Sequence, residues 1–112
     1  MMPARERSQL PRELRPFLDD TGRLNQWPAR YKVQRMAAAL LALRFETGRE
    51  YPEQDVNFVL MDGHTFADWA LLRRSLVDWG FLERESDGSR YRLCAGVAAA
   101  IERELGPTSE GP

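Results

Sequence analysis

Residues 65–93 constrain the fold of this chain more than any other stretch of its sequence. The stretch opens with Thr65-Phe66-Ala67-Asp68, which has the form of a capping box, in which two side chains satisfy free backbone N–H groups in the first turn of a helix. Gly80 is suited to end that helix. We therefore predict a helix over residues 65–79.

The segment after this helix has the pattern of a β-hairpin. Residues 81–85 and 90–93 are rich in aromatic and aliphatic side chains, and they flank the turn Ser86-Asp87-Gly88-Ser89. An Asp-Gly turn between two such segments is the strongest short-range signal for a hairpin. We predict a hairpin over residues 81–93 and interpret it as a candidate wing.

Three further helices are predicted from apolar periodicity. The first covers residues 28–44, with Pro28 at its first position. The second is short, covers residues 52–61 and follows an extended Tyr51. The third covers residues 95–105 and ends at Gly106. The expected buried stripes are Val33, Met36, Ala37, Leu40 and Leu43; then Val56, Val59 and Leu60; and finally Val97, Ile101 and Leu105.

The order helix, short extended piece, helix, helix, hairpin is that of a winged helix-turn-helix. We therefore predict an α+β, winged helix-turn-helix-like domain over residues 11–106, with three core helices, a hairpin wing and a C-terminal helix. A generic α+β domain, whose hairpin covers three helices, is the alternative. Residues 1–10 and 107–112 are polar and contain proline, and we expect both to be disordered tails.

Composition indicates one cytoplasmic domain. The chain has 112 residues, 43% of them hydrophobic, which is enough for a single core. It has no apolar run long enough to span a bilayer and no apolar segment behind its first arginines that would form a secretory signal. Its one cysteine, Cys94, can form no internal disulfide and is expected to be buried rather than reactive.

Charge argues against a dedicated nucleic-acid binder, because the formal net charge is −1. Residues 1–56 hold ten basic and eight acidic side chains, whereas residues 57–112 hold six and nine. The excess positive charge therefore precedes the helix over residues 65–79.

Arg73 and Arg74 are the first candidate nucleic-acid contacts. At 100° per residue they lie opposite the apolar side of their helix, where a guanidinium could bind guanine or phosphate. The alternative is that they pair with nearby acids: Asp68, Asp78, Glu83 and Glu85.

Arg90 and Arg92 share one face of the hairpin and could contact a phosphate backbone. The acids Glu83, Glu85 and Asp87 make cross-strand ion pairs equally accessible, and we favour a salt-bridged hairpin.

His64, with Asp62 and Asp68 nearby, has the residue types of a metal site or a general base. We favour a turn whose polar groups satisfy each other, and we expect no metal, no cofactor and no catalytic residue. Trp69 is a candidate for an exposed protein contact. The Val97, Ile101 and Leu105 stripe could pair two chains; if it folds back on the first helix, we expect a monomer.

Two resemblances follow from these residues. The string Ala70-Leu71-Leu72-Arg73-Arg74-Ser75-Leu76 resembles the recognition helix of DeoR-type repressors, although Leu71 and Ser75 replace polar and acidic residues. A longer pattern is similar to a bacterial family catalogued as domain of unknown function 2087, found alone or fused behind ArsR-type winged-helix regulators. Its residues are Gly22-Arg23-Leu24, Trp27-Pro28, Tyr51-Pro52-Glu53, Val56-Asn57, His64-Thr65-Phe66, Asp68, Leu72-Arg73-Arg74, Val77-Asp78, Gly80, Leu82, Arg84, Asp87-Gly88-Ser89 and Tyr91.

The leading hypothesis from the sequence is a module of a bacterial transcription regulator that binds duplex DNA or RNA weakly through residues 65–79 and 81–93. The rival is a protein-interaction or dimerisation domain of winged-helix shape without DNA-binding activity. A small enzyme is the third alternative.

Overall fold

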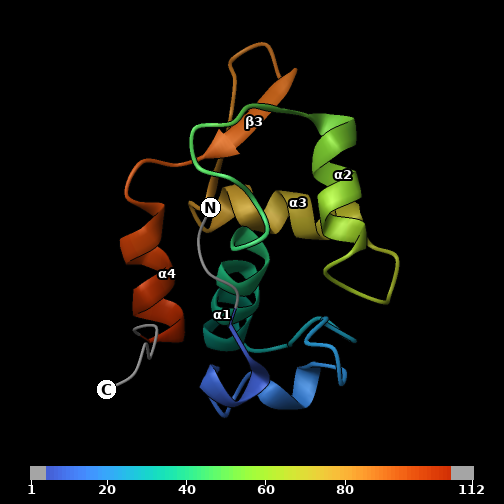
Figure 1. Cartoon of the computed structure of the whole chain (residues 1–112). Coiled ribbons are helices and arrows are strands. Elements are labelled where there is room, and N and C mark those ends of the chain that lie inside the picture. The colour runs from blue at the N-terminus through green and yellow to red at the C-terminus, as the bar shows by residue number, and fades with distance from the viewer. Residues whose placement is uncertain (1–4, 107–112) are drawn as a thin grey trace.

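The computed structural model describes residues 5–106, and within them the chain is an α+β protein with four α-helices and a small antiparallel sheet (Figure 1). The α+β class is thus confirmed, and the order of elements is compatible with a winged-helix-like fold. In chain order the elements are two 3-10 turns, Arg7–Gln9 and Arg15–Phe17, then α1 (Tyr31–Ala42), β1 (Tyr51–Pro52), α2 (Glu53–Met61), α3 (Trp69–Asp78), β2 (Leu82–Arg84), β3 (Arg90–Leu93) and α4 (Val97–Leu105).

The sheet has the strand order β1-β3-β2, with both pairs antiparallel. β2 and β3 form the predicted hairpin, and Gly88 takes the positive φ that its turn needs, at +77°. Side chains alternate across the strands, so that Tyr91 and Leu93 are buried while Arg90 and Arg92 are exposed. The hairpin prediction is confirmed.

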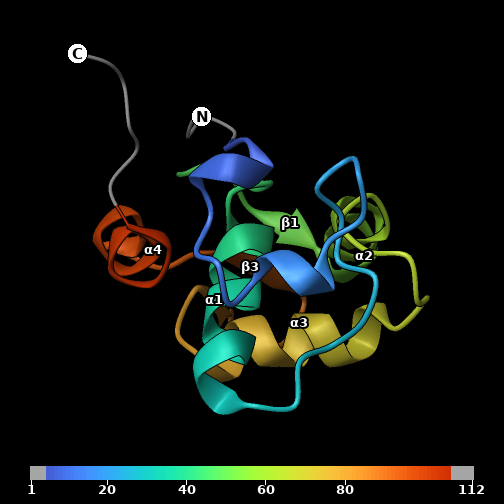
Figure 2. The same cartoon turned by 90° about the horizontal axis from the view of Figure 1, so that it is seen from below.

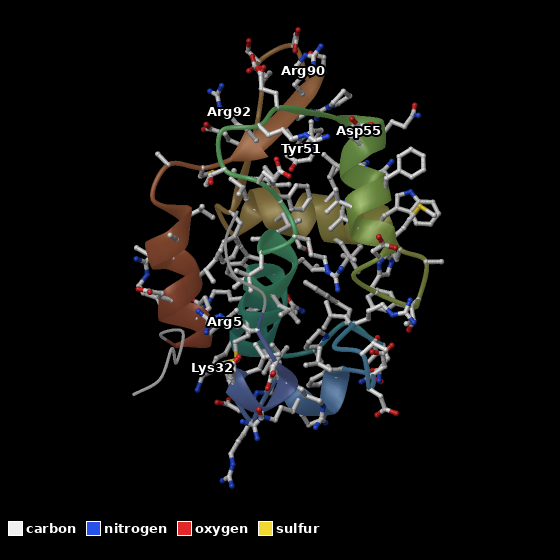
Figure 3. All side chains as sticks on the ribbon, viewed as in Figure 1. Arg5, Lys32, Tyr51, Asp55, Arg90 and Arg92 are labelled. Carbon is white, nitrogen blue, oxygen red and sulfur yellow. The ribbon has the colours of Figure 1, made fainter. Side chains whose placement is uncertain are left out.

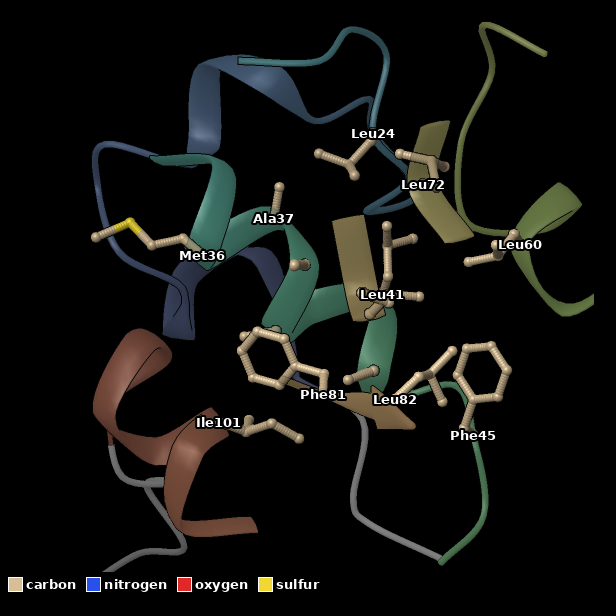
Figure 4. Close-up of a cluster of buried hydrophobic side chains, with 14 of the residues drawn as sticks. Leu24, Met36, Ala37, Leu41, Phe45, Leu60, Leu72, Phe81, Leu82 and Ile101 are labelled. Atoms are coloured by element: carbon tan, nitrogen blue, oxygen red, sulfur yellow. The ribbon is translucent and has the colours of Figure 1, made fainter. Parts of the chain in front are cut away.

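α1 is the central helix of the molecule. α2 and α4 lie on opposite sides of it in both views (Figures 1 and 2). Ala37, Ala38 and Ala39 are wholly buried, and such small side chains let neighbouring elements approach closely. The close-up in Figure 4 shows the core that results, with Leu41 of α1, Leu72 of α3 and Ile101 of α4 in one cluster.

The turn between α2 and α3 packs directly on α1. The backbone N–H of Leu24 donates to the Gly63 carbonyl at 2.9 Å, and the N–H of Thr65 donates to the Leu24 carbonyl at 2.9 Å. A Cβ added at Gly63 would lie only 2.6 Å from Leu41 Cδ2. A side chain at this position would have to displace the buried side chain of Leu41, so glycine allows the turn to lie this close to the helix.

These bonds correct the predicted start of α3. The capping box at Thr65 is wrong, because the Thr65 N–H is already bonded to Leu24. Ala67 turns the chain with a φ of +54°, and the helix begins at Trp69. Its N-cap is Asp68, whose side chain accepts a hydrogen bond from the Leu71 N–H at 3.3 Å.

α1 and α4 also begin later than predicted. α1 starts at Tyr31 rather than Pro28, because the backbone of its N-cap, Arg30, is extended, with φ −86° and ψ 134°. Gln34 Nε2 donates to the Pro28 carbonyl at 2.9 Å. α4 starts at Val97 after Gly96, which has a φ of +77°.

The ends of the described chain meet at the base of α4. Arg5 Nη1 donates to the Gly106 carbonyl at 2.7 Å, and Leu10 is buried in the core. Residues 5–10, which we expected to belong to a disordered tail, therefore pack against the domain. Residues 1–4 and 107–112 lie outside the described residues. Among the described helices, none is long and apolar enough to cross a membrane.

Candidate nucleic-acid interface

An open cleft of about 520 Å³ lies between α3 and the hairpin. One wall is α3, the other comes from β2 and β3, and the first residue of α2 closes one end. The lining residues are Glu53, Asp68, Ala70, Leu71, Arg73, Arg74, Val77, Asp78, Arg84 and Tyr91. Both predicted arginines of α3 thus contribute to the cleft, but their surroundings differ.

Arg73 is held by α2. Its side chain is only 20% exposed, its Nη1 donates to Asn57 Oδ1, and its Nε lies 3.7 Å from Glu53 Oε1. Neither partner is among the acids that the sequence suggested. Arg73 therefore lines the cleft but is not a free cation, because it ties α3 to α2.

Glu53 joins three elements at one carboxylate. The same oxygen that faces Arg73 accepts a hydrogen bond from Tyr91 Oη at 3.0 Å, so α2, α3 and β3 meet there. Burial of the phenol and its hydrogen bond to Glu53 raise the pKa of Tyr91. Tyr91 therefore keeps its phenolic proton, which it donates to Glu53, to a higher pH than an ordinary tyrosine does.

Arg74 and Arg84 are the free cations of the cleft. Arg74 is exposed, and in the described part of the chain neither guanidinium has a carboxylate within ion-pair distance. Arg84 Nε donates to the Gly88 carbonyl at 3.3 Å, and its guanidinium lies 5.7 Å from the centre of the Tyr91 ring. Arg84 was not among the predicted contacts, although strand alternation from the buried Leu82 places it on the face of the hairpin that also carries Tyr91.

Arg90 and Arg92 lie on the other face of the hairpin from Tyr91. Figure 3 labels both at the end of the molecule farthest from the N-terminal turns. Arg92 pairs with Glu83 at 2.7 Å and with Glu85 at 3.4 Å, and these glutamates raise its pKa. The salt-bridged hairpin is confirmed for Arg92. Arg90 is exposed and forms no ion pair with any residue from 5 to 106.

The cleft holds as many carboxylates as guanidinium groups. Glu53 is matched by Arg73, and Asp68 serves as the N-cap of α3. Asp78 follows Arg74 by one helical turn without pairing with it. The local charge is therefore balanced, and only Arg74 and Arg84 are available for an external anion.

His64 forms the self-satisfied turn that we favoured. The side chain is buried, with its Nδ1 2.6 Å from the Leu60 carbonyl, and its Nε2 accepts a hydrogen bond from the Asp68 N–H at 2.9 Å. The donor proton is therefore on Nδ1. Within the described residues, no group of three or more His, Cys, Asp or Glu side chains could hold a metal ion.

The remaining candidates are divided between surface and core. Trp69 is 37% exposed at the start of α3, whereas Val97, Ile101 and Leu105 are buried between α4 and the rest of the chain. The apolar stripe of α4 is thus covered within one molecule. Cys94 is half-buried, and burial together with the charge of Glu83 raises the pKa of its thiol.

Comparison with known proteins gives one match. The sequence model of a family described as an uncharacterized protein conserved in bacteria (DUF2087) matches residues 23–93, a range that includes both walls of the cleft and ends before α4. No curated protein and no solved structure matches the chain significantly.

Proposed function

The chain belongs to the bacterial family DUF2087, and from that premise we propose that it is a winged-helix module of a regulatory protein that binds nucleic acid weakly through α3 and the hairpin. The observation that supports this most is the cleft itself. Arg74 from the helix and Arg84 from the wing both line it, and neither forms an ion pair with a carboxylate among residues 5–106.

The arrangement of elements supports the winged-helix assignment. In that fold the second helix of the helix-turn-helix enters the major groove and the hairpin lies beside it. Here α3 follows α2 after a connection over residues 62–68, and β2 and β3 follow α3. The resemblance to DeoR-type recognition helices, and to proteins fused behind ArsR-type regulators, supports a role in transcription.

The structure changes which arginines we assign to this function. We propose that Arg74 and Arg84 bind phosphate as charged forks and that Arg90 is a third contact on the hairpin. Arg73 is a positioning residue, because Asn57 and Glu53 already engage its guanidinium. Arg92 acts within the hairpin through its ion pairs with Glu83 and Glu85.

Because this surface has few free cations, we expect a low affinity for nucleic acid that depends only weakly on salt concentration. Each neutralised phosphate contributes about −0.9 to the slope of log K against log salt, so two or three contacts predict a slope of about −2 to −3. The salt slope of a dedicated repressor would be much steeper.

Fluorescence anisotropy with a labelled mixed-sequence duplex tests this proposal. We expect binding at low salt that is lost at moderate salt and is abolished by Arg74→Ala plus Arg84→Ala. Arg12→Ala plus Arg103→Ala is the control, because it removes the same charge from exposed side chains outside the cleft. Absence of binding at low salt, or equal weakening by the control, would overturn the proposal.

A protein-interaction or dimerisation domain without nucleic-acid activity is the second candidate. It is favoured by the pairing of Arg73 and Arg92 with carboxylates of the same chain, which removes two of the four arginines expected from the sequence. A chain that binds no duplex at low salt would leave this candidate as the conclusion.

A further inference from the structure

The outer side of α2 carries an exposed apolar cluster. Phe58 is 57% exposed, Met61 49% and Trp69 37%, and Tyr31 is the one other large apolar side chain that is exposed within residues 5–106. Phe58 and Met61 are one turn apart on α2, so they share a face. Met61 and Trp69 line a shallow pocket of about 160 Å³ with His64, Thr65 and Ala67. We call Phe58, Met61 and Trp69 the α2 patch.

The charged side chains of the segment that carries the α2 patch are all acidic, and neighbouring elements bring two cations beside it, Arg44 at Gly63 and Arg73 at Asn57. Residues 50–72 contain no lysine or arginine, and their five carboxylates are Glu50, Glu53, Asp55, Asp62 and Asp68. Arg73 neutralises Glu53, but Asp55, Asp62 and Asp68 form no ion pair with a described residue. Figure 3 shows Asp55 near the start of α2. The patch is therefore apolar at its centre and acidic at its rim.

The α2 patch is held rigidly. His64 bonds the Leu60 carbonyl at the end of α2 and the Asp68 N–H at the start of α3. Leu24 bonds both Gly63 and Thr65, which fixes the turn to the body of the domain. A ligand that docks here pays little ordering entropy on the protein side, since the turn is already in place.

We propose that the α2 patch docks a basic amphipathic helix of another protein. Apolar side chains of that helix would cover Phe58, Met61 and Trp69, while its flanking lysines or arginines would face Asp55 and Asp62. A second copy meeting this patch through its own patch is disfavoured, because an isologous contact would set the acids of one copy against the same acids of the other. Nucleic acid is repelled by the same rim.

The probe for this surface is a labelled helical peptide of leucine and lysine, about 18 residues long so that it is helical when bound. Its counterpart replaces every lysine by glutamate and keeps the same apolar face. We expect the basic peptide to bind in an anisotropy titration and the acidic peptide not to bind. Equal binding of both peptides would overturn the proposal, because the acidic rim would then have no role.

Paired variants locate the binding. We expect Phe58→Ala plus Met61→Ala to weaken the basic peptide roughly tenfold or more, since removal of central apolar contacts dominates such losses. Tyr31→Ala is the matched control, an exposed aromatic at the start of α1, and it should leave the affinity unchanged. Circular dichroism and the Tm of each variant check that the fold is kept. An equal loss in both variants would overturn the proposal.

The acidic rim and the second copy need their own measurements. Asp55→Asn plus Asp62→Asn should weaken the basic peptide several-fold and flatten its salt dependence, whereas Glu102→Gln on α4 should not. Asp68 is left unchanged because it caps α3. Sedimentation velocity of the whole chain should show a species whose size does not depend on Phe58→Ala plus Met61→Ala. A wild-type dimer that this change dissociates would assign the patch to a second copy and overturn the proposal.

Discussion

α3 separates two surfaces of opposite character. On the hairpin side, Arg74 and Arg84 line a cleft and form no ion pair with any residue from 5 to 106. On the α2 side, Phe58 and Met61 are exposed near Asp55 and Asp62, which also form no ion pair within the described part of the chain. Arg73 lies at the border, because its guanidinium faces the cleft yet is bound by α2. Adjacent residues of α3 therefore have different environments: Arg73 is bound by α2, whereas Arg74 is exposed in the cleft.

The largest effect that separates the two surfaces is expected at His64. His64→Leu leaves the Asp68 N–H without its partner and removes one bond to the Leu60 carbonyl, which still accepts from the Gly63 N–H at 2.9 Å. We expect a loss of about 2 kcal/mol in the free energy of unfolding, measured in urea. The turn that carries the α2 patch should loosen most, so peptide binding should fall more than duplex binding.

Thr65→Ala is the control for the change at His64. The Thr65 side chain is exposed and is not the cap of α3, so we expect a change of less than about 0.5 kcal/mol. A loss at Thr65 as large as that at His64 would restore the capping box predicted from the sequence and contradict the assignment of Asp68 as the cap.

The next effect distinguishes the two adjacent arginines. Arg73→Met removes a hydrogen bond to Asn57 and an ion pair with Glu53, and we expect it to cost about 1–2 kcal/mol, the half-exposed Glu53 contributing little. Arg74→Met should change the free energy of unfolding by less than about 0.5 kcal/mol. Methionine keeps an unbranched apolar stem, so the comparison isolates the guanidinium.

Arg73→Met should reduce stability more than Arg74→Met does, whereas Arg74→Met should have the larger direct effect on duplex affinity. Arg74→Met should weaken binding directly and reduce the salt slope by about 1, because it removes one phosphate contact. Chemical denaturation and anisotropy on the same two proteins supply both readouts. If Arg74→Met destabilises the fold as much as Arg73→Met does, the assignment of separate roles fails.

The sequence predicts these two surfaces unequally because its signals act over different distances. The Asp87-Gly88 turn, Gly80 and the strand alternation are local, and the structure confirms the hairpin that they indicate. Arg73 is partnered by Asn57, which is 16 residues away, and no helical-face argument identifies such a partner. In the same way, the bond between Thr65 and Leu24 overrides a cap that is locally plausible.

α4 illustrates the same limit for apolar patterns. The Val97, Ile101 and Leu105 stripe correctly predicts a buried helix face, but periodicity does not say which surface covers it. The structure covers it within one chain, where Arg35 of α1 lies 3.4 Å from Glu104 of α4. The exposure of the α2 patch could not be predicted in this way, because the sequence around Phe58 and Met61 has no pattern that distinguishes an exposed apolar residue from a core residue.

The smallest predicted effect concerns the Glu53 carboxylate, at which α2, α3 and β3 meet. The pKa of Tyr91 is raised by burial and by the hydrogen bond to Glu53, so the folded chain binds the phenolic proton more tightly than the unfolded chain does. The resulting stabilisation is fully present below the ordinary pKa of 10.0 and is lost as the pH rises through the folded value. Denaturation at several alkaline pH values should therefore show a decline that Tyr91→Phe reduces. Glu53→Gln, which removes the charge but keeps an acceptor, should move the tyrosinate absorbance of Tyr91 to lower pH; an unchanged titration would mean that Glu53 does not link the cleft to α2.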